Sequence, residues 1–288
     1  MSSSDALTGE SVSRSRPSVG LALLGSEISV LFRRRRTWAM LAVLALVPIL
    51  IAVAVRLTRS APSGRGPAFL DQVTQNGLFV GVVGVVISIP LFLPLTVGVV
   101  AGDSIAGEAS AGTLRYLLIA PAGRVRLLVV KYLAAAVFCL AATLAVVVAG
   151  TLIGIALFPV GPATLISGDV IGVPETLLRS LLVAVYVTIS LLGLSAIGLF
   201  ISTLTDVPVG AMAATIVLSV VSQVLDSLPQ LDWLHPWLFT HYWLGVGDLL
   251  RQPIAWDSFG SNAVLQVGYI VIFGAMAYGR FSTKDVLS

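Results

Sequence analysis

Six long apolar runs dominate the pattern of this chain, and short polar or Gly/Pro-containing segments separate them. A helix needs about 20 predominantly apolar residues to cross the ~30 Å hydrocarbon core of a bilayer. We therefore predict six transmembrane helices, of which the third is long enough to tilt or to extend beyond the membrane. The predicted spans are Trp38–Val55, Leu78–Val100, Val129–Phe158, Leu177–Ser202, Val207–Leu225 and Asn262–Tyr278.

The segment before the first span has its own pattern. Apolar residues recur at roughly helical spacing over residues 18–36, and four consecutive arginines, 33–36, close it. This pattern predicts an amphipathic helix that lies in the headgroup layer, with the arginines as an anchor at the inner surface. The Ser-rich residues 1–17 predict a disordered cytoplasmic tail, and residues 18–288 a single membrane domain. No short apolar core with a small-residue cleavage site follows, as a signal peptide would require.

The composition agrees with a membrane protein. Of the 288 residues, 57% are apolar and only 11% are charged, where a soluble domain carries roughly 25% charged residues. Little sequence remains for a soluble catalytic domain. The single cysteine, Cys139, excludes a disulfide framework, and we expect it to pack in the core. The basic residues lie between the apolar runs, which indicates topology rather than a nucleic-acid-binding face.

The distribution of Lys and Arg predicts the orientation. With the N-terminus inside, ten basic residues lie near the inner ends of the spans and five near the outer ends, which favours a cell-membrane protein with both termini in the cytoplasm. The inner set is Arg33, Arg34, Arg35, Arg36, Arg115, Arg124, Arg126, Lys131, Arg280 and Lys284; the outer set is Arg56, Arg59, Arg65, Arg179 and Arg251.

The last outer segment, 226–261, is rich in aromatic residues. It predicts short interfacial or re-entrant helices before the sixth span, because Trp prefers the membrane boundary. His235 and His241 also lie there, and amphipathic interfacial residues explain them better than metal ligands. The tryptophans of this segment are Trp233, Trp237, Trp243 and Trp256.

Glycine and proline mark two further features of the spans. Gly77-x-x-x-Gly81 and Gly150-x-x-x-Gly154 allow close helix approach, either within one chain or along a dimer seam. Pro90 and Pro94 should bend or break the second span, and this bend could act as a gate.

The sequence also lacks several kinds of chemistry. The six spans carry no ionisable group in their interiors, and Arg179 lies at the outer edge of the fourth. This argues against an ion-coupled carrier, which keeps such a group where it works. No Gly-x-x-x-x-Gly-Lys-Ser/Thr loop is present, so the energy for uphill transport would have to come from a partner.

The inner loop 101–128 is long, polar and patterned. Asp103 or Ser104 could cap a short helix that Gly112 ends in a left-handed conformation. Thr113 could cap a second helix, 114–120, which Pro121 closes. This predicts a short helix–turn–helix at the cytoplasmic surface, with Glu108 and Arg115 near its tip and Leu114, Leu117 and Leu118 on one face of the second helix.

The stretch Gly102–Lys131 closely resembles the signature loop of type-2 ATP-binding-cassette (ABC) transporter permeases. That family shows Gly-Glu, then Gly-Thr-Leu, Leu-Leu, Pro, Arg and Lys, on an interfacial helix and six spans. It often has Arg after the Glu, where this chain has Ala109. The matching positions are Gly107, Glu108, Gly112, Thr113, Leu114, Leu117, Leu118, Pro121, Arg124 and Lys131.

The resemblance implies an all-α permease subunit, not an enzyme, that exports its cargo with the help of a separate ATPase docked under residues 102–121. ATP and Mg²⁺ would bind to that ATPase, with no cofactor on this chain. A second permease chain and membrane lipid are the other expected partners, without nucleic acid. The implied coupling residues are Asp103, Gly107, Glu108, Gly112, Thr113, Leu114, Arg115, Leu117, Leu118, Pro121 and Arg124.

The uncharged span interiors favour an apolar or amphiphilic cargo. The alternatives are an ion-coupled secondary carrier, a membrane scaffold that transports nothing, and an intramembrane enzyme. Transport that follows an ion gradient and ignores ATP would distinguish the first of these, and a neighbouring gene for an ATPase would favour the permease.

Overall fold

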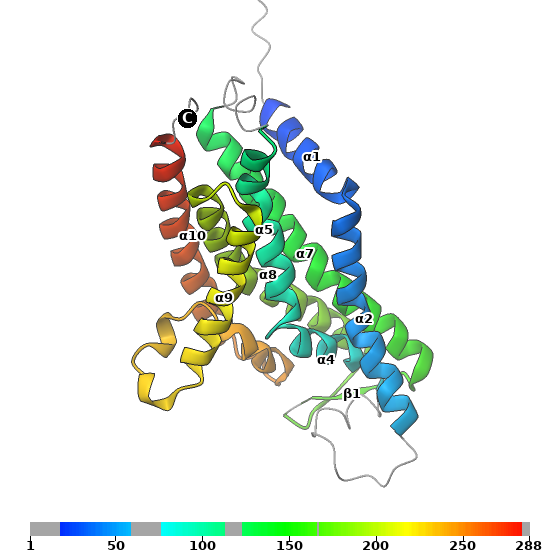
Figure 1. Ribbon diagram of the computed structural model, residues 1–288. Coiled ribbons are helices and arrows are strands. Elements are labelled where there is room, and N and C mark those ends of the chain that lie inside the picture. The colour runs from blue at the N-terminus through cyan, green and yellow to red at the C-terminus, as the bar shows by residue number, and fades with distance from the viewer. Residues whose placement is uncertain (1–17, 59–75, 113–122, 166, 284–288) are drawn as a thin grey trace, which may run out of the picture.

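The structure is a computed structural model that describes residues 18–58, 76–112, 123–165 and 167–283 (Figure 1). It is an all-α membrane protein, and within these ranges six helices are long and apolar enough to cross a bilayer. The predicted tail, 1–17, lies outside the described residues. The long helices are α2 (Arg35–Thr58), α5 (Phe92–Ser110), α7 (Arg124–Leu157), α8 (Val173–Leu204), α9 (Pro208–Asp226) and α10 (Asp257–Thr283).

Helix α8 forms the centre of the bundle. It packs against α5, α7, α9 and α10, and α2 packs against α7 on the far side. The predicted amphipathic helix is present as α1 (Ser18–Arg33), which lies against α7. The start of α1, the end of α5, the start of α7 and the end of α10 lie at one end of the bundle, here called the loop end (Figure 1). The shared end agrees with termini on one side, and the cytoplasmic assignment stays a prediction.

The second predicted span is not one helix. It is divided into α4 (Phe79–Ser88) and α5, and α5 continues ten residues beyond the predicted end at Val100. The break falls at Pro90, as predicted, since proline lacks an N–H and its ring clashes with the preceding turn. The Gln223 amide of α9 donates to the Pro90 carbonyl at 2.9 Å, which satisfies a group that the break exposes. Pro94 is tolerated in the first turn of α5, where no helical donor is needed.

The other end of the bundle carries small elements. A small antiparallel hairpin lies in the loop between the third and fourth long apolar runs. Its strands, β1 (Ala163–Thr164) and β2 (Val170–Ile171), have two residues each. The aromatic segment forms three short 3₁₀ helices, which confirms the prediction of short helices before the sixth span. These are η1 (Pro229–Leu231), η2 (His235–Trp237) and η3 (His241–Leu250).

Hydrogen bonds between α8 and this aromatic segment hold the segment against the core. Trp243 of η3 is only 2% exposed and donates to the Ser190 carbonyl at 3.0 Å, so its ring is buried within the protein rather than half-buried at a membrane boundary. Trp233, Trp237 and Trp256 are exposed. Arg179, expected at the outer edge, is buried and donates to the carbonyls of Leu249 and Arg251. This guanidinium therefore clamps the end of η3 to α8.

The two histidines make polar contacts within the same segment. The rings of His235 and His241 stack with centroids 5.9 Å apart. Nδ1 of His241 lies 2.7 Å from Asp226 Oδ1 and so links η3 to α9. Cys139 is fully buried beside Ser195, as core packing predicts.

The two glycine motifs meet each other inside the chain. A Cβ placed on Gly150 would lie 2.6 Å from the Gly81 Cα, and one on Gly77 would collide with the Gly154 carbonyl. The backbones of α4 and α7 therefore touch through these glycines. Of the two sequence interpretations, the structure uses the motifs for packing within one chain.

Replacing Gly150 with Ala tests this contact. The added methyl group meets backbone that cannot move aside, so we expect a lower unfolding temperature in detergent, with a loss of about 1–3 kcal/mol. Gly274→Ala on α10 is the matched control, because nothing lies within 4 Å of its Cβ position. The control should be neutral or stabilising, since Ala favours a helix over Gly. Unchanged stability of Gly150→Ala with an altered oligomeric state would instead indicate a dimer seam.

Candidate functional site

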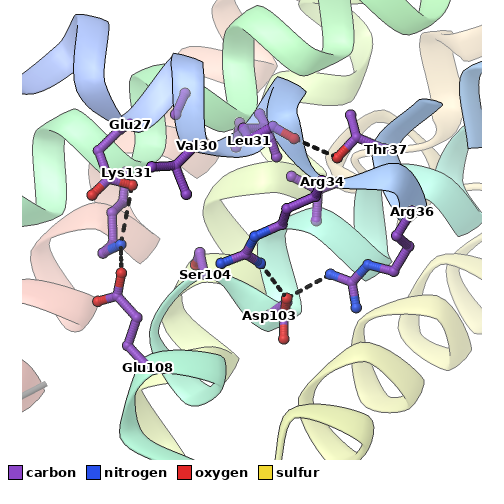
Figure 2. Close-up of a pocket in the computed structure, with 13 residues that line it drawn as sticks. Glu27, Val30, Leu31, Arg34, Arg36, Thr37, Asp103, Ser104, Glu108 and Lys131 are labelled. Atoms are coloured by element: carbon purple, nitrogen blue, oxygen red, sulfur yellow. Dashed lines mark hydrogen bonds and ion pairs between the residues drawn. The ribbon is translucent and has the colours of Figure 1, made fainter. Parts of the chain in front are cut away.

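Six charged side chains meet where α1, α5 and α7 join at the loop end. They line a small cavity beneath the bend between α1 and α2 (Figure 2). Two come from the last turns of α5 and one from α7. The other three come from α1, from the bend and from the first turn of α2. The junction cluster comprises Glu27, Arg34, Arg36, Asp103, Glu108 and Lys131.

Lys131 is the buried centre of this cluster. Its side chain is 4% exposed, and Nζ lies 3.3 Å from Glu27 Oε2 and in contact with Glu108 Oε1. A buried ammonium group requires such partners, because removal from water costs several kcal/mol for an uncompensated ion. One lysine on α7 therefore holds a carboxylate of α1 and a carboxylate of α5 at the same time.

Asp103 forms the second half of the cluster. Its carboxylate is 12% exposed and accepts hydrogen bonds from Arg34 at 3.0 Å and from Arg36 at 2.5 Å. The two guanidinium groups are about half-exposed, so each pair alone contributes little. Their common acceptor nevertheless fixes the bend onto α5. Three acidic and three basic groups make the cluster neutral as a whole.

Two side chains from the first turn of α2 stabilise the bend that positions these arginines. Thr37 Oγ1 donates to the Leu31 carbonyl at 2.6 Å, and Trp38 Nε1 donates to the Phe32 carbonyl at 2.7 Å. Carbonyls at the end of α1 lack helical donors, so these two bonds close the helix. The direction of the chain changes between α1 and α2, and Arg34 and Arg36 face α5 (Figure 2).

The predicted helix start at Asp103 or Ser104 was wrong. Both residues lie inside α5, which runs without interruption to Ser110. The reason is a distant contact: Ser202 Oγ of α8 accepts from the backbone N–H groups of Ile105 and Ala106 and donates to the Gly102 carbonyl. A polar stretch that the sequence pattern assigns to a loop is thereby held as helix against α8.

Glu108, predicted near the tip of a helix–turn–helix, lies in the last turn of α5, and its carboxylate contacts Lys131 inside the junction cluster. Gly107 leaves room for Asp103, since a Cβ there would lie 2.6 Å from Asp103 Oδ1. The prediction of uncharged span interiors needs correction as well: Lys131 lies within α7, a membrane-length helix, and is buried.

The remaining predicted residues divide into two groups. Gly112 has φ +69°, the left-handed conformation predicted for it, and Gly123 has φ +75°. Arg124 opens α7 and donates to the carbonyls of Phe281 and Ser282 at the end of α10. The others, Thr113, Leu114, Arg115, Leu117, Leu118 and Pro121, lie outside the described residues.

Sequence reasoning missed Glu27, Arg34 and Arg36 as site residues. The arginines were interpreted only as a surface anchor, and Glu27 was not singled out. A signal was present: Lys131 follows Leu127–Val130, four apolar residues, so a buried lysine with acidic partners elsewhere could have been expected.

Replacing Lys131 with Met tests the cluster. It leaves Glu27 and Glu108 together without a cation, so we expect a loss of about 3–5 kcal/mol in the free energy of unfolding in detergent. Adding Glu27→Gln and Glu108→Gln to this variant should restore most of the loss, because no uncompensated charge then remains. If the single variant matches the wild type, Lys131 does not hold the three helices together.

The comparisons with known proteins agree with this architecture. The family model described as "ABC-2 family transporter protein" matches residues 21–236, from α1 through the junction cluster and into the aromatic segment. No match of comparable significance was found among curated proteins. The family model covers more than half of the chain, together with five of the six membrane-length helices. This chain belongs to the ABC-2 family of transporter proteins.

Proposed function

We propose that this permease is the membrane subunit of an ATP-driven exporter, and that a separate ATPase drives it from the loop end. The ATPase would bind ATP and Mg²⁺ and dock under residues 102–121. The observation that carries the proposal is the junction cluster, which includes Asp103 and Glu108 and connects α5 to α1 and α7.

Helix α5 has the form that such coupling requires. It is 19 residues long, about 28 Å of rigid rod at 1.5 Å per residue. Its far end is the break at Pro90, and its near end leads into Gly112. A displacement applied at Gly112 would therefore move the whole of α5, with the break at Pro90 as the hinge.

The cargo we propose is apolar or amphiphilic, as the largely uncharged spans favour. Buried Lys131 does not favour the alternative of an ion-coupled carrier, because Glu27 and Glu108 already compensate its charge and it lies about two turns from the start of α7. A second permease chain, identical or related, would complete the pathway.

The division of labour between the two proteins can be tested with purified material. The chain lacks a phosphate-binding Gly-x-x-x-x-Gly-Lys-Ser/Thr loop, so we expect no ATP hydrolysis by the permease alone. Its cognate ATPase should co-purify with it, and the permease should change the rate of ATP hydrolysis. Robust hydrolysis by the isolated chain, or transport that follows an ion gradient without ATP, would contradict the proposal.

Gly112 offers a sharper test of coupling. Valine is strained at φ +69°, at a cost of about 1–3 kcal/mol, whereas Asn tolerates this conformation. We expect Gly112→Val to abolish most of the permease-dependent change in ATP hydrolysis in the reconstituted complex. Gly112→Asn is the matched control and should retain it. Equal behaviour of the two variants, at equal permease content, would mean that the left-handed conformation is not needed for coupling.

A further inference from the structure

We propose that a groove at the loop end binds one anionic phospholipid from the membrane. The groove lies between α1, the start of α7 and the end of α10, and has a volume of about 760 Å³. Its wall is apolar, and two arginines lie among its lining residues. The residues of this arginine groove that carry the argument are Leu21, Leu24, Arg124, Arg126, Val129 and Leu133.

The apolar wall is open to its surroundings. Leu21 is 73% exposed, Val129 48% and Leu133 40%, although they belong to helices that pack together at this end. An apolar groove beside membrane helices fills with acyl chains rather than water, because water would find no hydrogen-bond partners on such a wall. Acyl chains alone do not distinguish one phospholipid from another, so selection of the headgroup falls to the arginines.

The two arginines differ from the cations of the junction cluster. Arg34, Arg36 and Lys131 are compensated by acidic partners in the junction cluster. Among the described residues, by contrast, neither Arg124 nor Arg126 has an ion-pair partner, and none of those that line the groove is acidic.

Arg124 is held in place at the groove. Its Nη1 donates to the Ser282 carbonyl at 2.6 Å and to the Phe281 carbonyl at 3.2 Å. One nitrogen makes both bonds, and the described residues offer no partner to the other two. The guanidinium is thus fixed by α10 with donors left over, an arrangement that suits a phosphate oxygen.

This combination favours a lipid over a protein partner. A phospholipid carries an anion at one end and acyl chains at the other, as the groove carries arginines and an apolar wall. Basic pockets between transmembrane helices at an inner membrane surface bind anionic headgroups in this way. A helix of another protein would have to supply both an acidic residue and an apolar face at the same spacing.

Native mass spectrometry of the purified full-length chain tests the proposal. The probe is an equimolar mixture of phosphatidylglycerol and phosphatidylcholine with identical acyl chains. We expect the wild type to retain phosphatidylglycerol preferentially. Arg126→Gln should lower the ratio of bound phosphatidylglycerol to phosphatidylcholine about fivefold, the effect of one basic residue at an anionic headgroup. Arg126→Lys should keep most of the preference.

Two further variants show whether the lipid binds in this groove or elsewhere on the basic surface of the loop end. Arg35→Gln is the matched control, since Arg35 is exposed at the α1–α2 bend but does not line the groove. It should leave the ratio near the wild-type value, whereas Val129→Trp should reduce binding of both lipids by filling the groove. Arg126 makes no bond within the described residues, so its removal should not lower the unfolding temperature. An unchanged ratio in Arg126→Gln, an equal loss in Arg35→Gln, or full lipid retention in Val129→Trp would each overturn the proposal.

Discussion

The burial of one ammonium group determines how three helices meet. Lys131 is 4% exposed, and a charge at such a position is stable only with close partners of opposite sign. Glu27 and Glu108 supply them from segments that lie 104 and 23 residues away along the chain. The pairing places α1 across the start of α7 and fixes the last turns of α5 against α7.

The spans could be predicted from the sequence because membrane insertion depends on a local property, about 20 apolar residues in succession. The break at Pro90 and the left-handed Gly112 could be predicted for the same reason, since each follows from the chemistry of one residue. The continuation of α5 through Asp103 could not. It depends on three hydrogen bonds made by Ser202, whose partners in α5 lie 96–100 residues away along the chain.

The same distinction between local properties and tertiary contacts applies to the candidate site. Glu108 and Lys131 were identified through a sequence resemblance, but their contact with each other, and with Glu27, is a tertiary property. The resemblance implied only that Glu108 is a coupling residue, and the structure adds that its carboxylate contacts Lys131 in the interior. The arginines at 33–36 show a related effect, because a run of like charges conceals that Arg34 and Arg36 bind one aspartate.

Two of the contacts that hold α5 differ in kind, and this difference determines what each costs to break. Towards α9, the backbones touch: a Cβ on Gly102 would lie 2.7 Å from the Met212 nitrogen. Opening such a contact leaves a void and loses its dispersion energy. Towards the bend between α1 and α2, α5 is held through Asp103 by arginines that are about half-exposed and can exchange their partner for water at small cost. The contact with the α1–α2 bend is therefore cheaper to break than the backbone contact with α9. Any displacement of α5 would also have to break, or carry along, the Glu108–Lys131 pair with α7 and the Ser202 bonds with α8.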